Sequence, residues 1–147
     1  MQFKGLPHRC QLVRERHGVL WYNDSKGTNV GATLAAIEGL GPEIRGKLIL
    51  IVGGVGKNAD FSPLVPAIKK YVKTVILIGE AAPILAEIMK HQAEICFAKN
   101  MEDAIGLADT MTESSDSVLL SPACASFDMF KNFEHRGEVF TQLVQAL

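Results

Sequence analysis

The side chains best suited to bind an anionic ligand lie close together in residues 23–29 (NDSKGTN). This stretch supplies a carboxylate, an ammonium group and two hydroxyls between an extended hydrophobic run and a helical pattern. The unpaired amides at the start of a helix also attract anions. We therefore expect a ligand-binding edge at this strand-to-helix junction.

A second stretch of the same kind lies far downstream. Residues 121–128 (SPACASFD) follow a hydrophobic run, contain mostly small side chains and precede an amphipathic pattern. A third candidate is Lys57, a flexible point charge that follows a run of glycines and can bind a carboxylate or a phosphate. Because all three loops leave the ends of predicted strands, we expect them to form one shared site.

Less specific interpretations of these residues stay open. Asp24 and Lys26 also suit a local ion pair that accompanies capping of the following helix. Lys57 also suits a solvated lysine on a turn. His8 and Arg9, before the first predicted strand, also suit a mobile basic end.

Residues 54–59 (GVGKNA) fit the loose G-x-G-x-x-A pattern of dinucleotide-binding proteins. In such a site the glycine turn opens a helix directly, whereas here the helix-start signal comes only at Ser62 and Pro63. A free-standing dinucleotide-binding domain therefore remains an alternative. A Walker-type phosphate loop is excluded, because Ile51 and Asn58 stand where a glycine and a hydroxyl are required.

Two further chemistries are disfavoured. Cys124 has His135 and Asp128 downstream, as a nucleophile would need, but a cysteine in a small-residue loop is more often a buried apolar side chain. His17 and His91 form no helical pair with another ligand, so metal binding by this chain alone is not expected.

The composition favours one domain that binds neither nucleic acid nor membrane. The chain has 147 residues, 48% of them hydrophobic, and 15 Lys and Arg against 16 Asp and Glu give a net charge of −1. It lacks the basic field that attracts nucleic acid, and its apolar runs are shorter than a membrane span. Without a signal-type apolar stretch near Met1, a cytoplasmic location is expected. The three cysteines are expected to be free thiols.

Hydrophobic periodicity predicts alternating strands and helices. Strands are predicted at residues 10–14, 19–22, 47–52, 75–78, 94–97 and 117–120. Five helices are predicted. The first begins at Thr28, and the second begins at Ser62-Pro63, with Val65, Ile68 and Val72 facing the core. The third carries the apolar residues Ile84, Leu85, Ile88 and Met89, and the fourth follows an Asn100–Asp103 cap.

The fifth predicted helix lies at the C-terminus. Its core-facing residues are Phe133, Phe140, Val144 and Leu147, whereas Glu134, Arg136 and Glu138 point away from the core.

The first two predicted strands read as a hairpin, because a polar turn with Gly18 separates them. The later alternation implies βαβ units with right-handed crossovers. The predicted fold class is therefore α/β, with a Rossmann-like, mostly parallel sheet flanked by helices and an N-terminal hairpin that adds an antiparallel edge. Ligands of such sheets bind beyond the carboxyl ends of the strands.

Four motifs, in this order and over nearly the whole chain, resemble the C-terminal domain of the Mur ligases. The likeness is to the branch of that family that adds D-glutamate to UDP-N-acetylmuramoyl-L-alanine. The motifs are residues 5–9 (GLPHR), 23–29 (NDSKGTN), 53–57 (GGVGK), 120–128 (LSPACASFD) and its continuation 130–137 (FKNFEHRG).

The resemblance implies an ATP-dependent ligase of bacterial peptidoglycan synthesis, with roles in cell-wall biogenesis, cell shape and cell division. Residues 1–147 would be its C-terminal domain, and the N-terminal UDP-binding and central ATPase domains would lie outside this chain. In the family, ATP with Mg²⁺ phosphorylates the carboxylate of the UDP-precursor, and the amine of D-glutamate then attacks the acyl phosphate. Most Mg²⁺ ligands and the phosphate loop belong to the other domains, so this domain alone is expected to be inactive.

By the same resemblance, Asp24 would contact the ribose of ATP. Arg9 and Lys26 would lie at its phosphates, with His8 nearby. A carboxylate can accept hydrogen bonds from both ribose hydroxyls, and a guanidinium suits phosphate oxygens. The two carboxylates of D-glutamate would be held by Thr28, Lys57, Ser126 and the backbone of Phe127 and Phe133.

Two positions depart from the family pattern. Val55 stands where relatives usually have an aspartate, so any polar role of that acid is lost. Phe127 stands where a leucine is common, which a backbone contact would tolerate. Closure onto the central ATPase domain is expected to complete the site. A polyglutamate-type ligase domain with another amino-acid substrate is the alternative within the same superfamily.

Overall fold

A six-stranded sheet forms the centre of the molecule, with the strand order β1-β2-β6-β3-β4-β5. The computed structural model describes residues 8–56, 58–126 and 128–147. The strands are β1 (Gln11–Arg16), β2 (Val19–Asn23), β3 (Leu48–Gly53), β4 (Val72–Ile78), β5 (Glu94–Phe97) and β6 (Ser117–Leu120). The helices are α1 (Val30–Leu40), α2 (Val65–Tyr71), α3 (Ala82–Met89), α4 (Met101–Met111) and α5 (Phe133–Gln145), with short 3-10 turns at Gly41–Glu43 and Ser62–Leu64.

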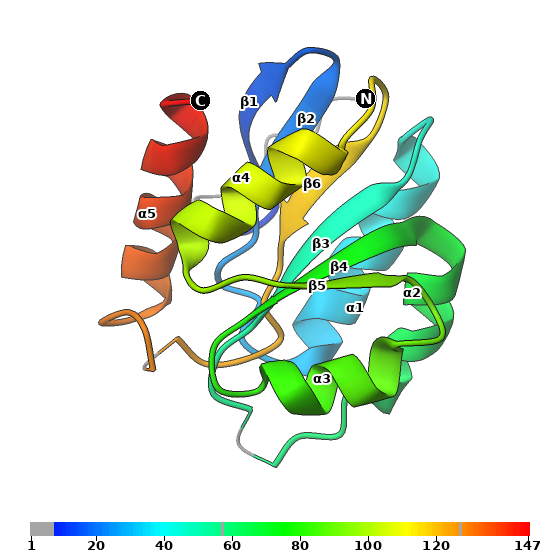
Figure 1. The fold of residues 1–147 in the computed structure, drawn as a ribbon, viewed down its shortest axis with the longest axis vertical. Helices are drawn as coiled ribbons and strands as arrows, with labels where there is room; N and C mark the ends of the chain where they lie inside the picture. The colour runs from blue at the N-terminus through cyan, green and yellow to red at the C-terminus, as the bar shows by residue number, and fades with distance from the viewer. Residues whose placement is uncertain (1–7, 57, 127) are drawn as a thin grey trace.

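The predicted α/β class is confirmed. β1 and β2 pair antiparallel, and every other neighbouring pair of strands is parallel. The hairpin is thus an antiparallel edge on a parallel sheet, and the carboxyl ends of β2, β6, β3 and β4 point toward the same edge (Figure 1). That edge is where the topology places a ligand.

Helices cover both faces of the sheet, because alternate residues of each central strand point in opposite directions. In β3, Leu48, Leu50 and Val52 pack in the layer of α1, α2 and α3. Ile49 and Ile51 of the same strand pack in the layer of α4 and α5. Figure 1 shows α4 and α5 lying together on one side of the sheet. All six residues of β3 are buried, as its doubly apolar sequence predicts.

Local signals fix several helix starts. The Asn100 side chain accepts a hydrogen bond from the amide of Asp103 at 2.8 Å, which confirms the predicted cap of α4. Asn29 caps α1 by accepting from the amide of Ala32 at 2.9 Å. The interpretation of Asp24 as a helix-capping residue is therefore wrong, because Asn29 fills that position.

Two predicted packing residues lie elsewhere. Val72 is the first residue of β4, since α2 ends at Tyr71 and the chain turns directly into the sheet. Ile84 is 59% exposed on α3, whose buried positions are Ala82, Leu85 and Met89. Among the described residues, no helix combines the length and the apolar character that spanning a membrane requires.

Candidate functional site

Backbone hydrogen bonds join the three loops that the sequence predicted to share a site. The amide of Ala123 donates to the carbonyl of Gly27 at 2.8 Å, which links the loop after β2 to the loop after β6. Val55 and Ala125 form an isolated antiparallel bridge, which links the loop after β3 to the same segment. The edge is therefore one continuous backbone network within this chain.

Two glycines permit this close approach. Gly53 and Gly54 have φ angles of 139° and 137°, which side chains with a Cβ rarely adopt. A Cβ on Gly54 would overlap the carbonyl oxygen of Ala125, and one on Gly53 would overlap that of Ile78. The glycine run thus serves the contact between loops, and the chain reaches the 3-10 turn Ser62–Leu64 before any helix starts. This geometry differs from a dinucleotide fold, in which the glycine turn opens the helix.

The Asp24 carboxylate lies at the centre of the network. Its side chain accepts from the Cys10 amide at 3.1 Å and from the Ser121 hydroxyl at 2.6 Å. The residue is only 3% exposed, and burial raises its pKa, although the Ser121 and Cys10 hydrogen bonds oppose that shift. No ion pair within the described residues links Asp24 to Lys26, so the interpretation of a local ion pair is wrong.

A pocket of about 380 Å³ opens beside this carboxylate. Arg9, Asp24 and Lys26 supply its charged groups, and small side chains of α1 form another wall. Two cations and one carboxylate around an otherwise apolar pocket suit a ligand with anionic groups and hydroxyls. The pocket lining is Arg9, Cys10, Asp24, Lys26, Gly27, Ala32, Ala35 and Ala36.

The segment that carries Arg9 is fixed to this site. The His8 carbonyl accepts from the Lys26 amide at 2.8 Å, and its ring nitrogen Nδ1 lies 3.0 Å from the Asn23 amide nitrogen. His8 and Cys10 both have positive φ angles, of 62° and 45°, which few non-glycine residues adopt. The interpretation of His8 and Arg9 as a mobile basic end is therefore wrong.

Phe133, at the start of α5, packs against the same loop. The Ser25 hydroxyl donates to its carbonyl at 2.6 Å. The Lys26 ammonium lies 6.0 Å from the centre of its ring, and the His8 ring lies 6.2 Å from it in an edge-on arrangement. The structure thus brings His8, Lys26 and Phe133 together, from three separate sequence motifs.

Arg136 is a residue of this edge whose place the sequence did not predict. Periodicity placed it away from the core, yet it is 1% exposed. Its guanidinium donates to the Ser25 hydroxyl at 3.0 Å, to the Ser25 carbonyl at 2.8 Å and to the Cys124 carbonyl at 3.0 Å. Burial lowers its pKa to about 10. Arg136 therefore clamps the loops after β2 and β6 against α5.

One signal in the sequence marks this close approach. Gly137 lies inside α5, where glycine costs about 0.5–1 kcal/mol relative to alanine. A Cβ there would meet the His8 ring and the Asn23 amide nitrogen. A glycine inside an amphipathic helix therefore indicated that another segment packs against the backbone beside Arg136.

The other predicted site residues fall into two groups. Thr28 is half-buried in the loop after β2, and Ser126 is 2% exposed in the loop after β6. Lys57 and Phe127 lie outside the described residues.

Cys124 is buried, and burial raises its pKa to about 12, which leaves a poor nucleophile at neutral pH.

Within the described ranges, no three His, Cys, Asp or Glu side chains gather as a metal site would require. The residues around Asp24 thus offer an anion and a hydroxyl partner, but they do not form a metal cage.

Comparisons with known proteins agree with this geometry. The profile of the family described as "Mur ligase, glutamate ligase domain" matches residues 8–124. The UDP-N-acetylmuramoylalanine–D-glutamate ligase of Coxiella burnetii (strain Dugway 5J108-111) is 58% identical over 145 residues, which cover 99% of this chain and 33% of that protein. The ligase of the same name from Pseudomonas putida (strain KT2440) is 53% identical over 146 residues, or 99% of this chain and 32% of that protein.

Among solved structures, the MurF ligase from Thermotoga maritima in complex with ADP has the same fold, with a TM-score of 0.65. It is 21% identical, and the match covers 99% of this chain and 33% of that one. The chain therefore spans about a third of the length of the curated relatives that it matches.

Proposed function

This chain belongs to the Mur ligase family as its glutamate ligase domain, and from that premise we propose that it contacts ATP and D-glutamate in a UDP-N-acetylmuramoylalanine–D-glutamate ligase. The complete enzyme would join D-glutamate to the UDP-precursor in the cytoplasm, for peptidoglycan synthesis. The UDP-binding and central ATPase domains would come from the two thirds of the relatives' length that this chain does not span. This domain alone would be inactive.

The observation that carries the proposal is the pocket shared by Arg9, Asp24 and Lys26. The Asp24 oxygens already accept from the Cys10 amide and the Ser121 hydroxyl. A carboxylate has about four acceptor sites, so it retains capacity for the ribose hydroxyls. Arg9 and Lys26 would lie at the phosphates, where exposed cations can adapt to the ligand.

The amino-acid side of the site would be formed by the loops that Arg136 clamps. Thr28 and Ser126 lie on loops that the Ala123–Gly27 hydrogen bond joins, and Phe133 begins α5, whose first amides have no partner inside the helix. Hydroxyl and amide donors suit the two carboxylates of D-glutamate. We include Lys57 and the Phe127 backbone in this set on the strength of the sequence motif alone.

The chemistry that this domain would support is amide formation from an acyl phosphate. ATP, bound with Mg²⁺ by residues mainly outside this chain, would supply the phosphoryl group. The residues of this chain would hold the nucleotide and keep the D-glutamate amine in line with the activated carboxyl carbon. The cations at the edge would stabilise negative charge in the transition state.

A direct test is ADP release by the full-length ligase from ATP, D-glutamate and UDP-N-acetylmuramoyl-L-alanine. Asp24→Ala and Lys26→Ala should each lower the rate about tenfold to a hundredfold, since each removes a charged hydrogen-bond partner. Lys90→Ala is the matched control, because Lys90 follows α3 directly and its ammonium forms an exposed ion pair with Glu87. Full activity of Asp24→Ala would overturn the proposal.

Substrate choice is tested in the same assay. D-glutamate should support ADP release, whereas L-glutamate and glycine should not, because the site would hold two carboxylates in one fixed geometry. Preference for a different amino acid would favour the polyglutamate-type alternative and would leave the nucleotide assignment in place.

A further inference from the structure

Ser121 carries a buried hydroxyl that contacts the proposed nucleotide site from within the fold. It is the first residue after β6 and is fully buried. Its amide donates to the carbonyl of Ile51 at 3.2 Å, which fixes its backbone beside β3. The residues that line the pocket beside Asp24 do not include it. Any role of this hydroxyl in ligand binding must therefore pass through a neighbouring side chain.

The Ser121 hydroxyl has one proton and two acceptors within reach. Its oxygen lies 2.6 Å from Oδ2 of Asp24 and 3.0 Å from Oγ1 of Thr33. A hydrogen bond to a charged acceptor is the shorter and stronger kind, so the proton is donated to Asp24. Thr33 holds the serine from α1, because its own hydroxyl donates to the Ser121 carbonyl at 3.1 Å.

The Asp24 carboxylate is thus held at both of its oxygens. The Cys10 amide donates to Oδ1 at 3.1 Å, and the Ser121 hydroxyl donates to Oδ2. Donors at both oxygens fix the rotation of the carboxylate group, which is otherwise broadly distributed in aspartate. Gly27 closes over the pair, since a Cβ there would lie 2.6 Å from Ser121 Oγ and 2.8 Å from Asp24 Oδ2. The remaining lone pairs of Asp24 are therefore kept in one orientation.

Ser121 also favours the charged form of Asp24. Burial raises the pKa of Asp24, and the hydrogen bond from Ser121 is the largest of the effects that oppose this rise. The Cys10 amide and the charge of Arg9 act in the same direction as Ser121. Only the ionised carboxylate accepts hydrogen bonds without also donating one.

We propose that Ser121 is a positioning residue, which holds the Asp24 carboxylate in the orientation and charge state that accept the ribose hydroxyls of the nucleotide. Ser121 acts through Asp24 and does not touch the ligand. The inference rests on the proposed contact between Asp24 and the ribose. Removal of the Ser121 hydroxyl should weaken recognition of the ribose hydroxyls and leave the other nucleotide contacts intact.

The test compares ATP with 2′,3′-dideoxy-ATP as substrates of the full-length ligase. The two nucleotides differ only in the ribose hydroxyls, so the ratio of their kcat/KM values measures recognition of those hydroxyls. The unchanged enzyme should prefer ATP about a hundredfold, because the analogue lacks two hydrogen bonds to a charged acceptor. Ser121→Ala should lower this preference to about tenfold or less, through loss of activity with ATP.

Ser117→Ala is the matched control. Ser117 is also a buried serine, but it lies at the opposite end of β6, so its variant loses the same oxygen away from the site. It should keep the full preference for ATP. Ser121→Cys is a second test variant, since a thiol has nearly the same shape but is a weak donor, and its preference should also fall. Ser121→Ala combined with Asp24→Ala should be no less active than Asp24→Ala, because the serine acts through the aspartate.

The outcomes separate this inference from the nucleotide site. An undiminished preference for ATP in Ser121→Ala or in Ser121→Cys would overturn the inference and leave the Asp24 contact standing. An equal loss of activity with both nucleotides would also overturn it, since that result indicates a general role in the fold. Equal use of ATP and 2′,3′-dideoxy-ATP by the unchanged enzyme would overturn the contact between Asp24 and the ribose, and this inference with it.

Discussion

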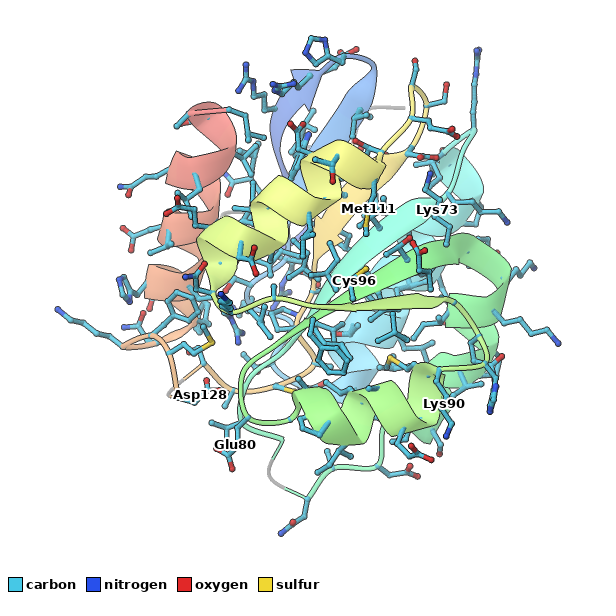
Figure 2. The ribbon with its side chains drawn as sticks, in the orientation of Figure 1. Lys73, Glu80, Lys90, Cys96, Met111 and Asp128 are labelled. Carbon is cyan, nitrogen blue, oxygen red and sulfur yellow. The ribbon has the colours of Figure 1, made fainter. Side chains whose placement is uncertain are left out.

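Two buried aspartates lie at opposite ends of β6, and they differ in how their charge is compensated. Asp116, 5% exposed before the strand, accepts from the amides of Lys47 and Glu113 and pairs with the Lys73 ammonium. Asp24, 3% exposed beside the end of the strand, accepts from an amide and a hydroxyl, and none of the ion pairs among residues 8–56, 58–126 and 128–147 includes it. Figure 2 shows Lys73 at one end of the sheet and Asp128, near the loops of the site, at the other.

The pKa values reflect this difference. Burial alone would raise the pKa of Asp116, but the Lys47 and Glu113 amides and Lys73 together lower it. For Asp24 burial prevails and the pKa is raised. A carboxylate that serves only the fold has its full set of partners, whereas the one at the site keeps a desolvation cost that a ligand can offset.

The largest effect is expected at the site end, from Arg136→Met. The variant leaves the Ser25 and Cys124 carbonyls buried without a donor, which should lower the free energy of unfolding by about 3 kcal/mol in urea denaturation. Arg16→Met is the control, because the Arg16–Asp109 pair lies near the surface and should contribute under about 1 kcal/mol. Equal stability of the two variants would contradict the clamp.

The next effect is at the opposite end. Asp116→Asn removes the ion pair with Lys73. An asparagine side chain has only one acceptor oxygen, so the backbone amide of Lys47 or of Glu113 would face its NH₂ group and lose a hydrogen bond. We expect a loss of about 2 kcal/mol in the free energy of unfolding. ADP binding should stay as in the unchanged chain, since Asp116 lies away from the site. Weakened ADP binding would show that the two ends of β6 are coupled.

The two carboxylates should also give stability profiles of opposite sign on either side of pH 3.8, the ordinary pKa of an aspartate. The stabilisation by Asp116 is complete above its unfolded pKa of 3.8 and is lost as the pH falls through its lower folded value. Asp24 has the opposite effect, because its pKa in the folded protein lies above 3.8. The free energy of unfolding therefore falls as the pH rises from 3.8 through the folded pKa. The measurement is urea denaturation over this pH range. In Asp116→Asn and Asp24→Asn the pH dependence of the free energy of unfolding that each carboxylate causes should disappear. Its size is about 1.4 kcal/mol per unit of pKa shift. Parallel profiles would refute the contrast.

The smallest change in stability is expected for Asp24→Asn. The neutral amide avoids the desolvation cost, can accept from Cys10, and leaves the Ser121 hydroxyl able to donate to Thr33 Oγ1, which lies 3.0 Å away. The free energy of unfolding at pH 7 should change by less than about 1 kcal/mol, while ADP binding weakens. A stability loss as large as that of Asp116→Asn would mean that Asp24 serves mainly the fold.

Much of the fold could be predicted from the sequence, because periodicity reports which faces are buried. The bounds of β5 and β6 and the cap of α4 match their predictions. Val72 and Arg136 were misplaced for a physical reason. Periodicity cannot tell where a helix gives way to a strand without a turn, and it treats every arginine as solvent-facing, although a long side chain can be buried when carbonyls receive its donors.

The site could be predicted in outline. Parallel strands bring their carboxyl ends to one edge, which grouped Asp24 and Ser126 correctly on neighbouring loops. The hydrogen bonds that join Gly27 to Ala123 and Val55 to Ala125 depend on tertiary register, which no local pattern contains. The ligand roles of all nine predicted site residues stay predictions.

Trp21 gives the molecule an optical reporter for the clamp on its loops. It is the single tryptophan of the chain, is fully buried, and its indole N–H has no hydrogen-bond partner among the described residues. Its ring lies 6.4 Å from that of Phe140, which sits one turn beyond Arg136 on α5. Any separation of α5 from the sheet would admit water to the indole, so its fluorescence emission should move to longer wavelength when that helix leaves.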